Sequence, residues 1–190
     1  MFIQTEQTPN PASLKFLPGR DVLGSGTANF PDIEEARRSP LAERLFTIDG
    51  VTGVFFGADF VTVSKRDDKD WYLLKPAVLG AIMEHFTNGA PILTDTADSN
   101  SDADHAAHAG APEDDEIVVQ IKDLLDTRVR PAVAQDGGDI TFQGYQDGVV
   151  FLTLKGACSG CPSSTMTLKA GIENLLRHYI PDVQEVRAAM

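Results

Sequence analysis

Residues 156–165 of this chain read Gly156-Ala157-Cys158-Ser159-Gly160-Cys161-Pro162-Ser163-Ser164-Thr165, and this stretch is the most informative part of the sequence. It holds the only two cysteines of the 190 residues, in a run of small residues between an apolar run and a helical pattern. Pro162 suits the first turn of a helix, where a missing N–H costs nothing. The positive end of that helix favours thiolate over thiol. We therefore expect an exposed strand-to-helix turn where two thiolates converge on one metal centre.

Two thiolates are half of the usual ligand set for an iron–sulfur cluster or a structural zinc ion. No other cysteine is present, so we expect a second copy of the chain to complete the set. The same spacing also occurs in thiol–disulfide oxidoreductases, in which Cys158 would be the nucleophile and Cys161 the resolving thiol. From the motif alone, a cluster half-site, a zinc half-site, a redox pair and a structural pair all remain open.

The residues around the motif predict a small sheet covered by two helices. Asp147-Gly148 is a strong signal for a tight antiparallel hairpin, which argues against a thioredoxin-like redox domain. Pro131 should kink or restart the first helix, and Gly137-Gly138 should end it. The predicted order is α-β-β-α-β, with a helix from 117, strands over 140–145 and 149–154, a helix over 162–179 and a strand over 183–186.

The N-terminal half predicts a second sheet with helices, in the order β-β-α-β-β-α. Its elements are strands over 2–5 and 13–16, a helix through 32–46 that Pro40 interrupts, a hairpin of strands over 51–56 and 59–64, and a helix over 76–86. The fold class expected for the whole chain is therefore α+β, with two small α/β-sandwich-like domains.

The formal net charge of −12 lies mostly in one segment. Residues 93–116 hold eight acidic and no basic residues, a charge of −8, whereas 1–92 carry −3 and 117–190 carry −1. Beyond Leu93 this segment has no large apolar side chain, so it cannot bury enough surface to order itself. We therefore expect domains over 1–92 and 117–190, joined by an acidic flexible linker over 93–116.

The same composition excludes several classes of protein. No basic surface is present that would favour nucleic acid as a partner. No apolar stretch is long enough to cross a membrane. The N-terminus has neither a signal-peptide core nor the Arg- and Ser-rich character of a transit peptide. We therefore expect a cytoplasmic protein, in which a close cysteine pair indicates metal or redox chemistry rather than a structural disulfide.

Several longer stretches resemble known families. Arg130-Pro131-Ala132-Val133 and Asp136-Gly137-Gly138-Asp139-Ile140, followed by the cysteine run, resemble the C-terminal domain of the NifU family. The opening Gln4-Thr5-Glu6-Gln7-Thr8-Pro9-Asn10-Pro11 with Leu14-Lys15-Phe16 resembles the N-terminal domain of Nfu-type proteins. The chain is thus similar to a two-domain Nfu iron–sulfur carrier, without the cysteine-rich scaffold and ferredoxin-like domains of full-length NifU.

The resemblance implies that Cys158 and Cys161 ligate a 4Fe–4S cluster shared between two subunits. A 2Fe–2S cluster on the same residues stays open as an alternative. It implies a homodimer bridged by the cluster, an upstream scaffold as donor and apo iron–sulfur proteins as recipients. Such a carrier is not an enzyme. The alternative function is a thiol–disulfide oxidoreductase that uses the same two cysteines.

Overall fold

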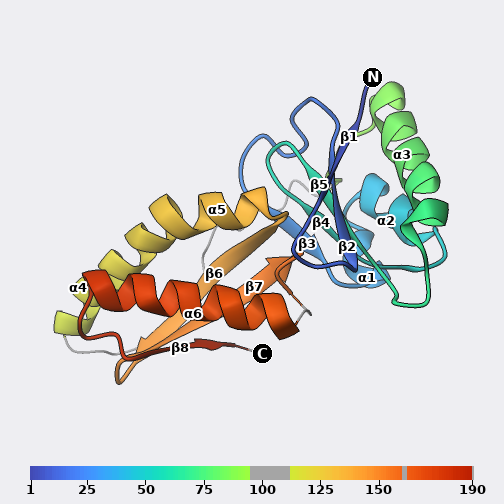
Figure 1. Cartoon of the computed structure of the whole chain (residues 1–190). Helices are drawn as coiled ribbons and strands as arrows, with labels where there is room; N and C mark the ends of the chain where they lie inside the picture. Colours follow the sequence, from blue (N-terminus) through green and yellow to red (C-terminus); the bar gives the residue numbers. More distant parts are fainter. Residues whose placement is uncertain (95–111, 160–161, 190) are drawn as a thin grey trace.

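The computed structural model describes residues 1–94, 112–159 and 162–189. In these residues the chain forms two sheets, each with helices and an apolar core of its own (Figure 1). The expected α+β class is therefore confirmed. Most of the predicted linker, residues 95–111, lies outside the described residues, and so does Cys161. No helix in the described part of the chain is long and apolar enough to cross a bilayer.

The N-terminal sheet has five antiparallel strands in the order β1-β2-β5-β4-β3. Its elements in chain order are β1 (Gln4–Gln7), β2 (Ser13–Leu17), β3 (Ala28–Phe30), α1 (Ile33–Ala36), α2 (Pro40–Phe46), β4 (Val51–Phe56), β5 (Val61–Lys65) and α3 (Trp71–Asn88). The short edge strand β3 was not predicted, because three residues carry too little alternation to be recognised.

Side-chain caps set the ends of the N-terminal helices. Ser39 accepts a hydrogen bond from the Ala42 backbone N–H and Pro40 follows at the first helical position, so α2 starts afresh after α1. Asp70 caps α3 in the same way, through the backbone N–H of Tyr72. The predicted start of this helix at Pro76 was therefore too late, and the proline lies inside the helix.

The N-terminal sheet is buried on both faces. On one face, alternate strand residues pack in the core beneath the helices: Leu14, Phe16, Val54, Phe56, Val61 and Val63. The intervening Lys15, Phe55 and Thr62 point the other way, because successive side chains of a strand alternate between faces. All three are nevertheless buried, with exposed fractions of 7%, 1% and 1%. Something other than the N-terminal helices must therefore cover this second face.

The C-terminal sheet has three strands in the order β6-β7-β8. Its elements are α4 (Pro112–Leu124), a π-helical turn (Leu125–Val129), α5 (Arg130–Gln135), β6 (Gly138–Gln146), β7 (Val149–Gly156), α6 (Pro162–Tyr179) and β8 (Glu185–Ala188). β6 and β7 form the predicted hairpin, with positive φ at both Asp147 (50°) and Gly148 (79°). The last strand pairs parallel to β7, after the crossover through α6.

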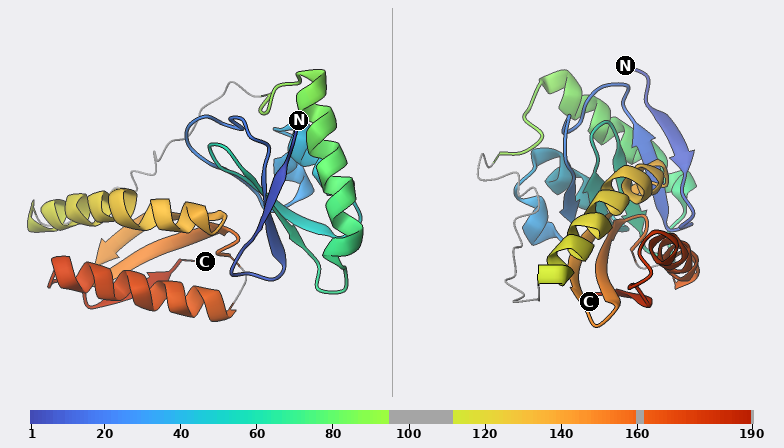
Figure 2. Two further views of the ribbon diagram at one scale, coloured as in Figure 1. Left: turned by 45° about the horizontal axis from the view of Figure 1, so that its top comes forward. Right: turned by 90° about the vertical axis from the view of Figure 1, so that its left-hand side faces the viewer.

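The predicted break at Pro131 takes the form of the π-helical turn between α4 and α5. Proline has no N–H to donate to the carbonyl four residues earlier, at Thr127, so the helical ladder widens there. The break redirects the chain so that α5 ends at the start of β6, next to the N-terminal sheet (Figure 2). It therefore helps to place the two glycines at 137–138 beside the cysteine turn.

Candidate metal centre

The cysteine turn joins the end of β7 to the start of α6. Gly156 has φ of 67°, a left-handed conformation that favours glycine. Both the backbone N–H and the hydroxyl of Ser159 donate to the Gly156 carbonyl, at 3.1 and 2.8 Å. The hydroxyl of Thr165 donates to the Cys158 carbonyl at 3.3 Å, which ties the turn to the first part of α6.

Cys158 lies inside the turn rather than at its surface. Its residue is only 7% exposed, and it belongs to the apolar core of the C-terminal sheet. Its sulfur packs against Gly138, where an added Cβ would lie 2.7 Å from Sγ and 2.7 Å from the Lys155 carbonyl oxygen. The expectation of an exposed turn was therefore wrong for Cys158, because the glycine of β6 leaves room for the thiol.

The electrostatic surroundings of Cys158 favour the thiol. Burial raises the pKa of its side chain to about 12, and the nearby carboxylates of Asp136 and Asp139 act in the same direction. The sequence predicted that the α6 N-terminus stabilises a thiolate, but at Cys158 burial and the two carboxylates outweigh this effect. A protonated, buried thiol is also unlike the accessible, low-pKa nucleophile of a disulfide oxidoreductase.

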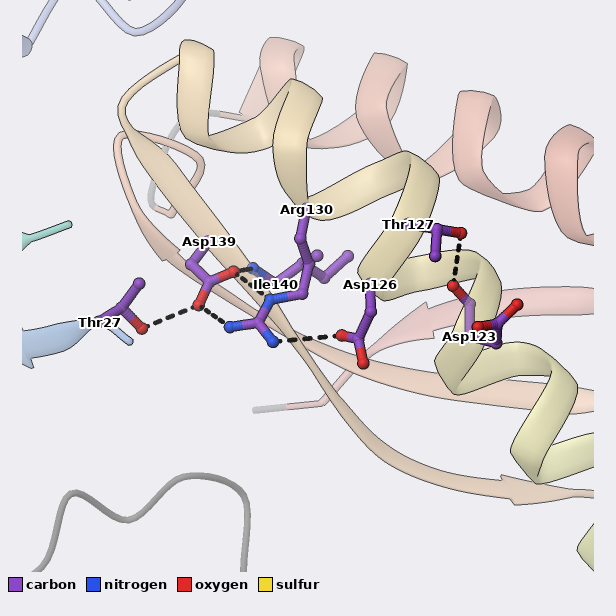
Figure 3. Close-up of polar contacts among 7 residues, drawn as sticks. All are labelled: Thr27, Asp123, Asp126, Thr127, Arg130, Asp139 and Ile140. Carbon is purple, nitrogen blue, oxygen red and sulfur yellow. Dashed lines mark hydrogen bonds and ion pairs between the residues drawn. The ribbon is translucent and has the colours of Figure 1, made fainter. Parts of the chain in front are cut away.

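One of these carboxylates, Asp139, is the centre of a buried polar network (Figure 3). Arg130 pairs with it through two hydrogen bonds, Nε to Oδ1 at 2.9 Å and Nη2 to Oδ2 at 3.0 Å. The same carboxylate accepts from the Ile140 backbone N–H at 2.8 Å and from the Thr27 hydroxyl at 2.9 Å. Asp139 and Asp126 together raise the pKa of Arg130, so it is always charged. The network fixes the start of β6, the strand that packs against the cysteine.

The structure places one of the two predicted site residues and leaves the other outside its described part. Cys158 sits as given above, whereas no position is described for Cys161. Within the described residues, no group of three or more His, Cys, Asp or Glu side chains could hold a metal ion. The sequence analysis did not predict the ion pair between Arg130 and Asp139, although both residues lie in the stretches that resemble the NifU family.

Comparisons with known proteins place both halves of the chain in described families. Residues 3–89 match the family "Scaffold protein Nfu/NifU N terminal", and residues 121–187 match the family "NifU-like domain". The chain is 52% identical over 191 residues to the human protein named NFU1 iron-sulfur cluster scaffold homolog, mitochondrial, covering 100% of this chain and 72% of that protein. The Drosophila sechellia protein of the same name is 55% identical, and the match covers 98% of this chain.

The chain spans 64% of the length of the Drosophila sechellia relative. Among solved structures, a NifU-like protein from Saccharomyces cerevisiae superposes with a TM-score of 0.41 and 26% identity, covering 50% of this chain and 86% of that one.

These relatives correct one expectation. The cytoplasmic location expected from the N-terminal sequence is contradicted, because relatives more than half identical to this chain are named as mitochondrial proteins. The absence of signal and transit features was a weak argument, since it rested on the first residues of the sequence alone.

Proposed function

This chain belongs to the Nfu family of iron–sulfur cluster scaffold proteins, and from that premise we propose that it carries a cluster on Cys158 and Cys161 and hands it to apo-proteins. The observation that carries the proposal is the conformation of the cysteine turn. Gly156 starts the turn, Ser159 closes it onto the Gly156 carbonyl, and Thr165 of α6 donates to the Cys158 carbonyl. Cys158 is thus held in the strand-to-helix connection that also contains Cys161 in the sequence. Thiolate sulfur is the ligand type that iron–sulfur clusters use.

The cluster is a 4Fe–4S cluster shared by two subunits in this proposal. Four thiolates are the usual set and each chain has two cysteines, so a two-fold axis through the cluster completes the coordination. Because the cluster binds only the dimer, it stabilises the dimer by linkage. Holo-protein should therefore be a homodimer, and removal of the cluster should shift the protein toward monomer.

The cluster is cargo, and the chain is a carrier rather than an enzyme. A donor scaffold supplies the cluster, and cysteines of a recipient apo-protein take it by ligand exchange. In that exchange the recipient thiols lose their protons as Cys158 and Cys161 of both subunits regain theirs, and the iron–sulfur core leaves intact.

Anaerobic reconstitution with iron and sulfide tests the proposal. We expect about two iron atoms and two sulfides per chain, visible absorption typical of a cluster, and a dimer in sedimentation. Cys158→Ser and Cys161→Ser should each abolish both the cluster and the cluster-dependent dimer. Thr52→Val, an exposed change on β4 that leaves both cysteines and the turn as they are, is the control and should retain the iron.

Three results would contradict the proposal. A single-cysteine variant that kept a full cluster would exclude ligation by two cysteines from each chain. A strictly monomeric holo-protein would exclude the shared cluster. Colourless protein with tightly bound zinc, or with turnover in a disulfide-reduction assay, would favour the zinc or the oxidoreductase interpretation instead.

A further inference from the structure

The second face of the N-terminal sheet carries a row of side chains that spans three neighbouring strands. Lys15 of β2 lies opposite Thr62 of β5, and Thr62 lies opposite Phe55 of β4. We call these three residues the docking row. The Lys15 ammonium also lies 4.7 Å from the centre of the Phe60 ring, on the same buried face. An ammonium, a hydroxyl and an aromatic ring thus stand side by side across the middle of the sheet.

Each member of the docking row meets backbone of the C-terminal half. Lys15 Nζ donates to the Gln135 carbonyl at 3.2 Å, and Thr62 Oγ1 donates to the Gly137 carbonyl at 2.8 Å. The Phe55 ring lies against Gly156, where an added Cβ would be 3.0 Å from Cδ1. The two carbonyls belong to Gln135, the last residue of α5, and to Gly137 in the following turn. At a helix C-terminus such carbonyls accept no hydrogen bond from the helix itself. The docking row therefore covers the glycine turns that enclose Cys158.

Two contacts at the edges extend this surface to both sides of the cysteine. The Asn10 side-chain amide donates to the Ser159 carbonyl at 3.5 Å, directly after Cys158. Thr27, just before β3, donates to Asp139 at the start of the strand behind the thiol (Figure 3). The N-terminal half thus contacts Ser159, which follows the cysteine, and Gly156, which lies two residues before it. Through Asp139 it also contacts β6, the strand on which the Cys158 sulfur packs.

We infer that the second face of the N-terminal sheet is a binding surface for the cysteine turn of its own chain, and that this docking holds Cys158 in its inward position. The occupant is specified by its chemistry: glycines that allow close approach of an aromatic ring, and backbone carbonyls that accept from Lys15 and Thr62. A turn with side chains in place of these glycines would not fit, because Gly137 and Gly156 have no space for a Cβ.

A functional consequence follows, and it rests on the proposed function. A sulfur packed on Gly138 and only slightly exposed cannot ligate iron that a second subunit also ligates. The turn has to rearrange before two chains can surround one cluster, and every docking contact around the turn opposes that rearrangement. Undocking of the N-terminal half therefore precedes loading of the cluster.

The alkylation rate of Cys158 in metal-free protein tests the docking without any cluster. In a Cys161→Ser background Cys158 is the only thiol, and iodoacetamide at one fixed pH reports its accessibility. Thr62→Val removes the hydrogen bond to Gly137 with no change of charge or shape, so the alkylation rate should rise about fivefold, as expected for one lost hydrogen bond. Thr52→Val, an exposed change of the same kind on β4, should leave the rate unchanged.

A second variant covers the case in which Thr62→Val disturbs folding. The only described hydrogen-bond partner of the Thr27 hydroxyl is Asp139 across the interface, so Thr27→Val should raise the rate in the same direction with unchanged circular dichroism. If both variants fold and react at the rate of the parent protein, the docking surface does not hold Cys158 and the inference is overturned.

Iron uptake, measured with both native cysteines present, then tests the consequence for loading. Thr62→Val and Thr27→Val should take up iron and sulfide faster than the parent and Thr52→Val. Faster alkylation with unchanged uptake would overturn the claim that undocking precedes loading. If no variant or parent binds a cluster at all, the proposed function fails, whereas the alkylation rates still decide whether the docking exists.

Discussion

Gly138 decides where the Cys158 sulfur can lie. An alanine Cβ at this position would come within 2.7 Å of Sγ and within 2.7 Å of the Lys155 carbonyl oxygen, and the second of these atoms is backbone that cannot simply rotate away. We predict that Gly138→Ala lowers the free energy of unfolding by about 1–3 kcal/mol, as expected for overpacking. It should also displace Cys158 and reduce iron binding on reconstitution. Urea unfolding and iron analysis measure the two effects.

Gly171 in α6 is the matched control for this change. Nothing lies within 4 Å of an added Cβ there, and alanine is a better helix former than glycine. Gly171→Ala should therefore raise the free energy of unfolding, by up to about 1 kcal/mol, and leave iron binding as it is. Equal stabilities of the two alanine variants would show that the space beside Cys158 is not limiting.

At the scale of one element, α3 carries a buried histidine that makes stability depend on pH. His85 is 4% exposed, and its Nε2 has no hydrogen-bond partner. Burial lowers the pKa of His85 below 6.5, and the charge of Arg44 acts in the same direction, against a hydrogen bond with the Ala90 backbone. The folded state thus favours the neutral ring. The contribution of His85 to the free energy of unfolding is complete at pH values above its pKa in the unfolded state. This contribution is lost as pH falls through the lower pKa of His85 in the folded state.

The predicted result is a loss of stability as pH falls below about 6.5, the ordinary histidine pKa. His85→Gln stays neutral, so its stability should depend less on pH in this window than that of the parent. His178→Gln, which changes an exposed histidine of α6, should keep the parent dependence. Thermal melts at pH values on both sides of the window measure the three slopes. A parent-like slope in His85→Gln would assign the acid sensitivity to other groups.

At the scale of the whole molecule, we propose that the chain consists of domains over 1–92 and 117–190, with 93–116 as the connection. Each half has a continuous apolar core, and neither core shares a residue with the other. The docking row joins them through two hydrogen bonds to backbone carbonyls and the packing of Phe55 on Gly156, and no residue of the row belongs to either core. Cleavage of the connection should therefore leave both cores folded.

Proteolysis with an Asp-specific protease tests this arrangement. The connecting segment holds Asp95, Asp98, Asp102 and Asp104 ahead of α4 and has no Lys or Arg, so trypsin finds no site within it. Brief digestion of native protein with the Asp-specific protease should cut there first and yield two stable fragments with little loss of circular dichroism. Cleavage that starts inside either sheet, or immediate degradation of one fragment, would contradict two independently stable cores.

Local signals determined much of this protein from its sequence. The helix Pro162–Tyr179 was predicted with its observed bounds, because a proline starts it and a proline follows it. The hairpin at Asp147-Gly148 was also predicted, because positive φ at both turn positions is a property of these two residues and their neighbours. The cysteine pair as the candidate site, and the family, likewise came from a contiguous run of residues.

Only the tertiary structure decided what depends on residues far apart in the chain. The inward position of Cys158 depends on Gly138 of strand β6. The raised pKa of Cys158 depends on burial and on the carboxylates of Asp136 and Asp139. The second buried face of the N-terminal sheet has no sequence signature, because a lysine and a threonine between apolar residues indicate a solvent-facing side. Those polar side chains are buried because the partners of Lys15 and Thr62 are carbonyls more than seventy positions away. Every residue has a backbone carbonyl, whatever its side chain, so the pattern of residue types does not predict this contact.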